Sequence, residues 1–311
     1  MRRVSIVVPI YNEEGNVADL HKEIKEVCEN NNYVYEIIFV DDGSSDKTVE
    51  ICKMLKPLKL IQFRKNFGQT AAMDAGIKAA QYEYVVTMDG DRQNDPADIP
   101  KMIDYLEENN LDVVSGWRKN RKDTLMKRFT SRGANFLRHL IVHDGIHDSG
   151  CSLKVYKKEC FHGINLYGEQ HRFIPALLKI KGFTVGEVVV NHRARTAGKT
   201  KYNWKRTIKG FVDMISVWFW SKFASRPLHL LGGAGMGFLG LGFVCAVWSV
   251  ILFISGAEMK KNIFPPLLTI FFVIVGLLLF VFGLMSEILM KTYYGLHVDA
   301  PYSIKKITEN K

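Results

Sequence analysis

Acidic side chains gather in one short stretch, MDGDRQNDP at residues 88–96, directly after an apolar run. The stretch holds Asp89, Asp91 and Asp95. A calcium loop of the EF-hand kind starting at Asp89 would need Gly at its sixth position and Glu at its twelfth, but the chain has Asn94 and Pro100 there. Two interpretations stay open for the stretch alone: a solvated Asp-Gly turn, and a carboxylate pair that holds a metal carrying an anion.

Two more polar stretches follow predicted strands, PIYNEE after the first and VDDGSSD after the second. In parallel sheets ligands bind beyond the carboxyl ends of the strands, so these stretches are expected to share one edge with MDGDRQNDP. The residues expected to converge there are Tyr11, Asn12, Glu13, Asp41, Asp42, Asp89 and Asp91. So many acids repel one another unless a cation or hydrogen-bond donors offset them. This favours Mg²⁺ or Mn²⁺ held by a carboxylate pair, with the phosphates of a substrate as further ligands.

The elements that must position these residues alternate by type. Short β-branched runs predict buried strands at residues 4–10, 35–40, 58–63, 84–88 and 112–116. Between the first two, Val17, Leu20, Ile24 and Val27 line one face of a predicted helix, and Asp95-Pro96 is typical of an N-cap followed by a proline at the first helical position. The alternation indicates an α/β fold, Rossmann-like, with a mainly parallel sheet covered by helices.

The substrate that suits this edge is a nucleotide diphospho-sugar. A Walker A sequence is absent from the chain, so a loop that cradles ATP is unsupported. A divalent metal between the carboxylates and a diphosphate would neutralise charge as the leaving group departs. Asp42 and Glu13 can accept hydrogen bonds from the base and the ribose.

Composition excludes several classes of protein. The chain has 311 residues, of which 47% are hydrophobic, so a disordered or fibrous protein is excluded. Its five cysteines stand far apart without a C-x-x-C pair, which favours reduced thiols over a disulfide framework or a zinc site. The start, MRRVSIVVPIYNEE, has too short an apolar run for a signal peptide, so the N-terminal part is expected to stay in the cytoplasm.

Two apolar segments predict a transmembrane hairpin. Residues 228–254 and 263–286 carry no Asp, Glu, Lys or Arg, and each exceeds the roughly 20 residues that cross a bilayer as a helix. Seven Lys or Arg residues lie between positions 199 and 226 and three follow the hairpin, against two in its loop. The positive-inside rule therefore places both flanks in the cytoplasm. The dinucleotide-like GMGFLG at 235–240 lies inside the first segment, where Gly233 and Gly237 favour close helix packing or a lipid slot instead.

Seven motifs together resemble one family. They are VVPIYNEE, VDDGSSD, RKNFGQTAAMDAG, MDGDRQNDP, HDSGCSLKVYKKE, HRF and RTAGKTKY, followed by the two-helix hairpin. The set resembles the family 2 glycosyltransferases that make polyprenyl-phosphate sugars, the group of dolichyl-phosphate mannose synthase and bactoprenol glucosyltransferase. The resemblance spans nearly the whole chain. It implies a GT-A nucleotide-sugar-binding domain, dependence on a divalent metal and inversion at the anomeric carbon.

The resemblance also implies roles for single residues. The positions that match its substrate-binding motifs are Pro9, Tyr11, Asn12, Glu13, Val40, Asp41, Asp42, Gln69 and Gly90. Asp89, Asp91 and Gln93 would surround the metal, with Asp91 also counted as catalytic. Arg118 would approach the phosphates, and Arg195 with Lys201 would face the reacting phosphate. The motif His171-Arg172-Phe173 is matched without a chemical role.

A lipid monophosphate acceptor needs little help from a base. Its second pKa is near ~6, so its attacking oxygen is already ionised at neutral pH. Cations must then hold two like-charged reactants together, and Arg195, Lys199 and Lys201 lie shortly before the hairpin. Three roles stay open for Asp148 in HDSGC: orienting the phosphate or sugar, abstracting a proton, or structuring its loop.

The expected organisation has four parts. These are a cytoplasmic catalytic domain at 1–202, an interfacial amphipathic helix at 203–227, a transmembrane hairpin at 228–290 (helices 228–254 and 263–288) and a cytoplasmic tail at 291–311. Trp204, Ile208 and Phe211 on one face of the second part, with basic residues elsewhere, suit a helix at the membrane surface. Ordinary core packing is the alternative for this helix. Small residues in the hairpin permit a homo-oligomer.

The expected function is metal-dependent, inverting transfer of a hexose to undecaprenyl or another polyprenyl phosphate at the inner membrane, for modification of a cell-envelope glycan. UDP-glucose is the first donor expected, with UDP-N-acetylglucosamine, UDP-galactose and GDP-mannose behind it. A processive polysaccharide synthase is disfavoured because Q-x-x-R-W is absent and one hairpin cannot form a polymer channel. A tethered scaffold or nucleic-acid-binding protein is the rival suggested by the net charge of +10, but nucleic-acid-binding motifs are absent and nucleic acid is not expected as a partner.

Overall fold

The computed structural model describes residues 1–119, 146–166, 168, 170–194, 219, 223, 226–256 and 262–296. The chain divides into two compact units, Met1–Val217 and Trp218–Lys311. The first contains a sheet and its helices, and the second contains two long helices.

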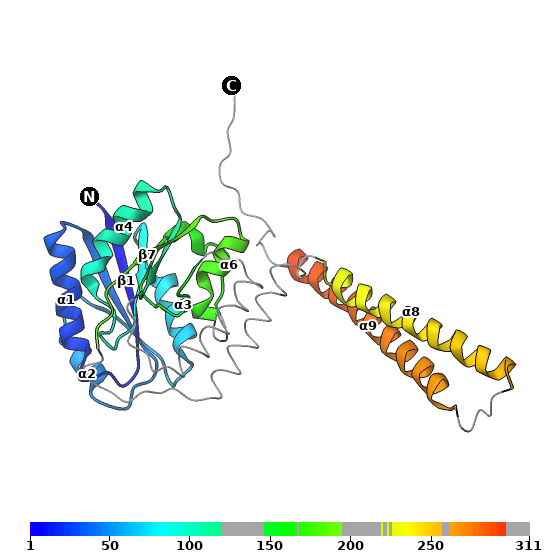
Figure 1. The fold of residues 1–311 in the computed structure, drawn as a ribbon. Helices are drawn as coiled ribbons and strands as arrows, with labels where there is room; N and C mark the ends of the chain where they lie inside the picture. The colour runs from blue at the N-terminus through cyan, green and yellow to red at the C-terminus, as the bar shows by residue number, and fades with distance from the viewer. Residues whose placement is uncertain are drawn as a thin grey trace. The chain divides into compact units, whose positions relative to one another are not determined.

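A seven-stranded sheet forms the centre of the first unit (Figure 1). Its strands are β1 (Arg3–Ile10), β2 (Val34–Asp41), β3 (Lys59–Gln62), β4 (Tyr84–Thr87), β5 (Val113–Trp117), β6 (Lys154–Lys157) and β7 (Val185–Val189). They lie in the order β3-β2-β1-β4-β6-β5-β7. Strand β6 is antiparallel to both of its neighbours, whereas the other pairs are parallel. The predicted mainly parallel sheet is confirmed, and β6 and β7 are strands that the sequence analysis did not predict.

Helices cover both faces of this sheet. They are α1 (Val17–Asn30), α2 (Thr48–Cys52), α3 (Gln69–Ala79), α4 (Ile99–Glu108) and α6 (Ile174–Ile180). Alternate residues of β1 point to opposite faces, as in any strand. Ile6 packs into a core with α1 and α4, whereas Val7 packs into a second core with α3 and α6. The two cores make a three-layer sandwich in which the strand ends lie at fixed positions.

Two local predictions can be compared with the helices. Asp95 accepts a hydrogen bond from the backbone N–H of Ala97 at 3.0 Å, with Pro96 next in the chain, so the predicted cap is confirmed. It opens a single 3₁₀ turn, Pro96–Asp98, that leads into α4. In α1 the buried face ends at Cys28, while Val27 is only partly buried. The predicted stripe was wrong by one residue there, because Cys28 lies four residues after Ile24 and stays on the inner face.

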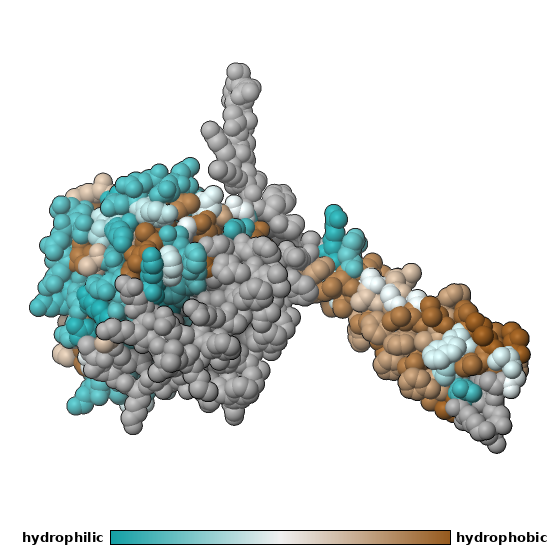
Figure 2. Space-filling view, viewed as in Figure 1, coloured by the Kyte–Doolittle hydropathy of each residue, from teal (hydrophilic) through white to brown (hydrophobic). Residues whose placement is uncertain are grey.

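The second unit contains an apolar helical hairpin. Helices α8 (Pro227–Ile254) and α9 (Phe264–Leu296) pack against each other, and each includes a segment long and apolar enough to span a membrane, Pro227–Ile254 and Phe264–Thr292. Figure 2 shows hydrophobic surface over most of this hairpin. Helix α9 continues past the predicted end at residue 288, because intrahelical hydrogen bonds do not require an apolar sequence.

Glycines bring the two helices into backbone contact. A Cβ added at Gly235 would lie 2.7 Å from the carbonyl oxygen of Gly276, and one at Gly283 would lie 3.1 Å from the nitrogen of Gly232. By contrast, a Cβ at Gly233 or Gly237 would meet nothing within 4 Å. The G-x-x-x-G pair singled out in the sequence is therefore not what packs the two described helices together.

Candidate active site

The loops after β1 and β2 are joined by hydrogen bonds at the carboxyl edge of the sheet. Asn12 donates its backbone N–H to Ser44 Oγ at 2.9 Å, and its Oδ1 accepts from the backbone N–H of Ser45 at 2.8 Å. The backbone N–H of Glu13 donates to Thr48 Oγ1 at 2.8 Å. Asn12 adopts the left-handed conformation, with φ 54°, which non-glycine residues rarely adopt. The first two predicted loops therefore do converge. Pro9 and Val40 face each other as partners in the β1–β2 register.

Asp41 and Asp42 organise their own surroundings. Both are buried, with 2% and 4% of their surface exposed. The carboxylate of Asp42 accepts backbone N–H groups of Phe67 at 2.7 Å and of Gly68 at 2.9 Å, just before α3. Asp41 accepts the backbone N–H of Ser44 at 3.2 Å. These hydrogen bonds offset much of the repulsion expected among the acidic side chains at this edge.

The loop after β4 meets both of these regions. Gly90 is buried, and a Cβ there would lie 2.9 Å from Ile10 Cγ2, so a larger residue would have to displace the Ile10 side chain. Gln69, the first residue of α3, donates from Nε2 to Asp89 Oδ1 at 2.7 Å. Asp91 accepts the backbone N–H of Gln93 at 3.1 Å. The contact between Gln69 and Asp89 fixes one carboxylate of the predicted metal pair.

The electrostatics of Asp89 suit a cation. Burial raises the pKa of Asp89, the nearby charge of Asp91 raises it further, and Ser152, Arg118 and Lys154 act in the opposite direction. A divalent ion would relieve this repulsion between two oxygen ligands of the type Mg²⁺ and Mn²⁺ prefer. Within the described residues, no group of three or more His, Cys, Asp or Glu side chains could hold a metal alone. An ion at the two carboxylates would take its remaining ligands from substrate phosphates and water.

The antiparallel direction of β6 brings a fourth loop to the same edge. Thr87, at the carboxyl end of β4, pairs with Lys154, at the amino end of β6. Consequently the residues that precede β6, HDSGCSL at 147–153, approach the carboxyl ends of the parallel strands. Ser152 Oγ donates to Asn94 Oδ1 at 2.8 Å and so ties this loop to residues 88–95 after β4, which carry the predicted metal pair and are called the metal loop below.

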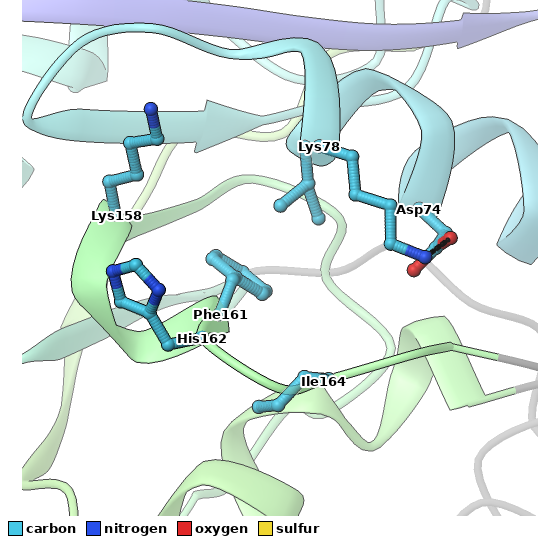
Figure 3. Close-up of a pocket in the computed structure, with 7 residues that line it drawn as sticks. Asp74, Lys78, Lys158, Phe161, His162 and Ile164 are labelled. Carbon is cyan, nitrogen blue, oxygen red and sulfur yellow. Dashed lines mark hydrogen bonds and ion pairs between the residues drawn. The ribbon is translucent and has the colours of Figure 1, made fainter. Parts of the chain in front are cut away.

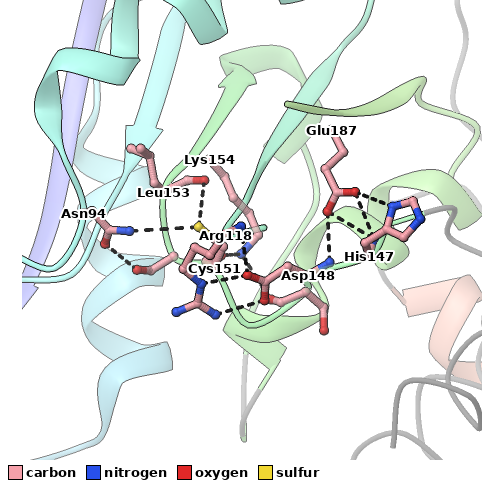
Figure 4. A network of polar contacts seen from close by, with 10 residues as sticks. Asn94, Arg118, His147, Asp148, Cys151, Leu153, Lys154 and Glu187 are labelled. Atoms are coloured by element: carbon pink, nitrogen blue, oxygen red, sulfur yellow. Dashed lines mark hydrogen bonds and ion pairs between the residues drawn. The ribbon is translucent and has the colours of Figure 1, made fainter. Parts of the chain in front are cut away.

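Arg118 and Asp148 form a bidentate ion pair within this region (Figure 4). Arg118 Nε donates to Asp148 Oδ2 at 2.7 Å, and Nη2 donates to Oδ1 at 2.9 Å. Their side chains are 11% and 16% exposed. Burial lowers the pKa of Arg118, but the carboxylate of Asp148 outweighs it and the net shift is upward. Both oxygens of Asp148 are thus engaged by a permanent cation, which favours a positioning role over proton abstraction.

Lys154 is a site residue that the sequence analysis missed. It is 2% exposed, and its ammonium donates to the backbone carbonyl of Cys151, with Ser149 O at 3.5 Å. Burial lowers its pKa, while Cys151, Asp148 and Asp89 favour the charged form. The net shift of the Lys154 pKa is downward, and its amino group lies behind the acidic edge. A lysine inside KVYK gives no sequence signal of burial, because lysine is almost always exposed.

The motif His171-Arg172-Phe173 contacts helix α3 through its histidine. His171 Nδ1 lies 2.7 Å from Thr70 Oγ1, and both residues are buried. Thr70 follows Gln69 in the first turn of α3. The histidine therefore supports the turn from which Gln69 reaches Asp89.

Three predicted residues, Arg195, Lys199 and Lys201, lie outside the described residues, as does most of the predicted interfacial helix.

A separate hollow of about 100 Å³ lies beside α3 (Figure 3). It is lined by Asp74, Ile77, Lys78, Lys158, Phe161, His162 and Ile164. Lys158 follows β6 at the end that pairs with the start of β4, so this hollow is at the opposite edge of the sheet from Asp89. It is also too small for a nucleotide sugar, since ligand pockets measure roughly 300–1,000 Å³.

Solved structures share the fold. Glucosyl-3-phosphoglycerate synthase from Mycobacterium tuberculosis, in complex with Mn²⁺, UDP-glucose and phosphoglyceric acid, matches with a TM-score of 0.56 and 16% identity, over 70% of this chain and 80% of that one. The same enzyme with Mg²⁺ and UDP matches with a TM-score of 0.56 at 15% identity, over 71% and 79% of the two chains. At this identity the likeness concerns the fold alone, and it confirms the predicted GT-A-like architecture.

Relatives match over nearly the full length. Dodecaprenyl-phosphate galacturonate synthase from Rhizobium johnstonii is 36% identical, over 99% of this chain and 94% of its own. Undecaprenyl-phosphate 4-deoxy-4-formamido-L-arabinose transferase is 30% identical in Pseudomonas fluorescens, over 99% and 91%. Its counterpart in Yersinia pestis is 30% identical over 99% and 94%. The profile of the family "Glycosyl transferase family 2" matches residues 5–164, which include every strand from β1 to β6 except the first residues of β1. The chain therefore belongs to glycosyl transferase family 2.

Proposed function

We propose that the protein transfers a sugar from a uridine diphosphate donor to a polyprenyl phosphate, with Mg²⁺ or Mn²⁺ at Asp89 and Asp91. The observation that carries this proposal is the 36% identity over 99% of the chain, apolar helices included, to a relative named for dodecaprenyl phosphate. The arrangement of the described site is consistent with it: acids from three loops and a buried arginine meet at one edge of a GT-A-like sheet.

The donor would lie along this edge. The ends of β1 and β2, with Tyr11, Glu13 and Asp42, would hold the nucleotide. When bound, the metal would supply charge neutralisation to the departing diphosphate. Gln69 orients Asp89 toward that task through its 2.7 Å hydrogen bond. Arg118 would bring further positive charge to the phosphates, and Asp148 fixes the plane of its guanidinium.

The acceptor phosphate would attack the anomeric carbon from the face opposite the diphosphate. A bond forms between that carbon and a phosphate oxygen, the bond to the diphosphate oxygen breaks, and UDP leaves with the electron pair. Because the acceptor oxygen is ionised near neutral pH, the step needs no strong base. This agrees with an Asp148 that is already occupied by Arg118. Arg195, Lys199 and Lys201 are proposed to hold the acceptor phosphate.

The hairpin would anchor the enzyme where its lipid substrate resides. The excess of Lys and Arg on both flanks of the hairpin supports a catalytic unit on the cytoplasmic side. The proposed boundaries remain a catalytic domain at 1–202, an interfacial segment at 203–227, a hairpin at 228–290 and a tail at 291–311.

A donor screen tests the function. Purified protein in detergent is incubated with undecaprenyl phosphate, Mn²⁺ and one radiolabelled donor at a time, and label entering the organic phase is counted. The panel holds UDP-glucose, the expectation from the sequence, the UDP forms of galacturonate and of 4-deoxy-4-formamido-L-arabinose, the sugars in the relatives' names, and UDP-N-acetylglucosamine, UDP-galactose and GDP-mannose.

We expect one donor to dominate and EDTA to abolish transfer. The variant Asp91→Asn should be inactive, whereas the matched control Asp104→Asn, at a surface pair with Arg2, should keep full activity. Transfer that persists in EDTA would refute the metal assignment. Failure of every donor to label the lipid would refute the proposed acceptor.

A further inference from the structure

The metal loop has a strained residue next to its carboxylates. Arg92, between Asp91 and Gln93, adopts the left-handed conformation with φ 61°. Such a backbone persists only where the surroundings hold it. Two carboxylates of α1 do so: Arg92 Nη1 lies 2.5 Å from Asp19 Oδ2, and Nη2 lies 2.6 Å from Glu23 Oε1.

The chain that follows β7 is fixed to the same loop. The backbone N–H of Arg193 donates to Gln93 O at 2.9 Å, and Asn94 forms an antiparallel bridge with His192. Arg193 Nη2 lies 2.5 Å from Asp95 Oδ1. In sequence, this chain leads within two residues to Arg195, the first residue proposed to hold the acceptor phosphate.

Glu23 joins these two regions. Its Oε1 pairs with Arg92, and its Oε2 pairs with Arg193 Nη1 at 2.6 Å. Its side chain is 24% exposed, against 61% for Asp19, which pairs with Arg92 one helical turn earlier. Each guanidinium therefore contacts two carboxylates, and Glu23 is the carboxylate that both arginines contact.

We infer that Glu23 is a positioning residue that couples the metal loop to the acceptor side of the site, so that binding of a metal-nucleotide complex strengthens binding of a polyprenyl phosphate. This inference rests on the proposed function. The physical argument is that a ligand at Asp89 and Asp91 selects one conformation of Arg92, and Arg92 and Arg193 can share Glu23 only while both loops hold their present positions. An isolated exposed ion pair would carry little coupling, whereas this one spans two backbone segments that are also hydrogen-bonded to each other.

The test measures binding rather than turnover. Full-length protein in detergent is titrated calorimetrically with farnesyl phosphate, a short polyprenyl phosphate, with and without saturating UDP and Mn²⁺. The ratio of the two dissociation constants is the coupling factor. We expect tightening of at least fivefold in the wild type, a coupling factor near one in Glu23→Gln, and a factor within twofold of wild type in Asp19→Asn. The last variant is a matched control because it removes a carboxylate on the same helix that, among the described residues, pairs with Arg92 and not with Arg193.

Several results would overturn the inference. The wild type could bind the two probes independently or fail to bind farnesyl phosphate. The Glu23→Gln protein could keep wild-type coupling, or the Asp19→Asn protein could lose as much coupling as Glu23→Gln. If Glu23→Gln does not fold, Arg193→Lys replaces it in the test, because a lysine keeps the charge but cannot reach both Glu23 and Asp95. An undiminished coupling factor in Arg193→Lys would also contradict the inference. Absence of sugar transfer in the donor screen overturns the proposed function alone, since the coupling factor needs no turnover.

Discussion

Breaking the ion pair between Arg118 and Asp148 should destabilise the catalytic unit more in either single variant than the pair is worth. We consider Arg118→Met, Asp148→Leu and the variant with both changes. Each single change leaves a charge with little solvent, because the two side chains are 11% and 16% exposed. Removing one partner of a buried pair costs about 3–5 kcal/mol, and the residual exposure places this pair at about 3 kcal/mol.

The double variant leaves no stranded charge. Replacing both partners by apolar side chains is often close to neutral, but the loop also loses a contact to the backbone N–H of Arg118 at 3.3 Å. We therefore expect the double variant to cost about 1 kcal/mol, well below the sum of the two single effects. For a unit of this size, about 3 kcal/mol corresponds to a shift of roughly 6–12 °C in melting temperature.

The assay is thermal unfolding of the full chain in detergent, followed by intrinsic tryptophan fluorescence. Both single variants should melt at lower temperatures than the double variant, and none of the three should transfer sugar, since Arg118 is proposed to contact the phosphates. Melting shifts in the double variant that equal the sum of the single shifts would refute the reasoning. So would a wild-type melting temperature in Asp148→Leu.

Three further outcomes are expected. Asp91→Asn should lower the initial rate by at least about 100-fold, as loss of a metal ligand and its charge would, with an unchanged melting temperature; a full rate across a Mn²⁺ titration would contradict the metal assignment. Thr70→Val leaves His171 without its hydroxyl partner and should cost about 1–3 kcal/mol in thermal melts, while Thr70→Ser should melt like the wild type; equal melting of all three proteins would refute this. Burial alone would raise the pKa of Asp112, but hydrogen bonds from Thr184 and the ammonium of Lys157 outweigh it and hold the pKa below its ordinary value of 3.8. A carboxylate with a lowered folded pKa adds stability above its unfolded pKa and loses that stability as pH falls through the folded value, so melting temperatures should drop below about pH 4, and Asp112→Asn should flatten the drop; an Asp112→Asn protein with an unchanged pH profile would contradict it.

The sequence predicts the parallel core of this fold because those strands are uninterrupted apolar runs. Strands β6 and β7 lack that signal. KVYK begins and ends with lysine, and VGEVV carries a glycine and a glutamate in an edge strand. Their existence depends on partners far along the chain: β6 pairs with β4 and β5, and β7 pairs with β5. Local pattern does not encode such pairing, so the antiparallel insertion was missed.

The candidate site was likewise predicted in part from the sequence. Convergence of Asn12, Asp42 and Asp89 follows from one rule about strand ends, so spacing alone predicted it. The same rule did not predict which side chains would pair with one another. Gln69 reaches Asp89 across 20 residues and Arg118 reaches Asp148 across 30, because the layers of the sandwich, and not the sequence interval, bring them together.

The contacts on either side of residues 120–145 have a consequence for the length of that segment. Trp117 and His147 stack with ring centroids 4.5 Å apart, and Arg118 pairs with Asp148, one residue later in each segment. The two ends of the intervening chain are thus fastened together by interactions that do not involve that chain itself. Lengthening such a tethered insertion costs only about 0.6 kcal/mol per doubling. Changes of length between residues 120 and 145 would therefore leave the Trp117–His147 and Arg118–Asp148 contacts in place.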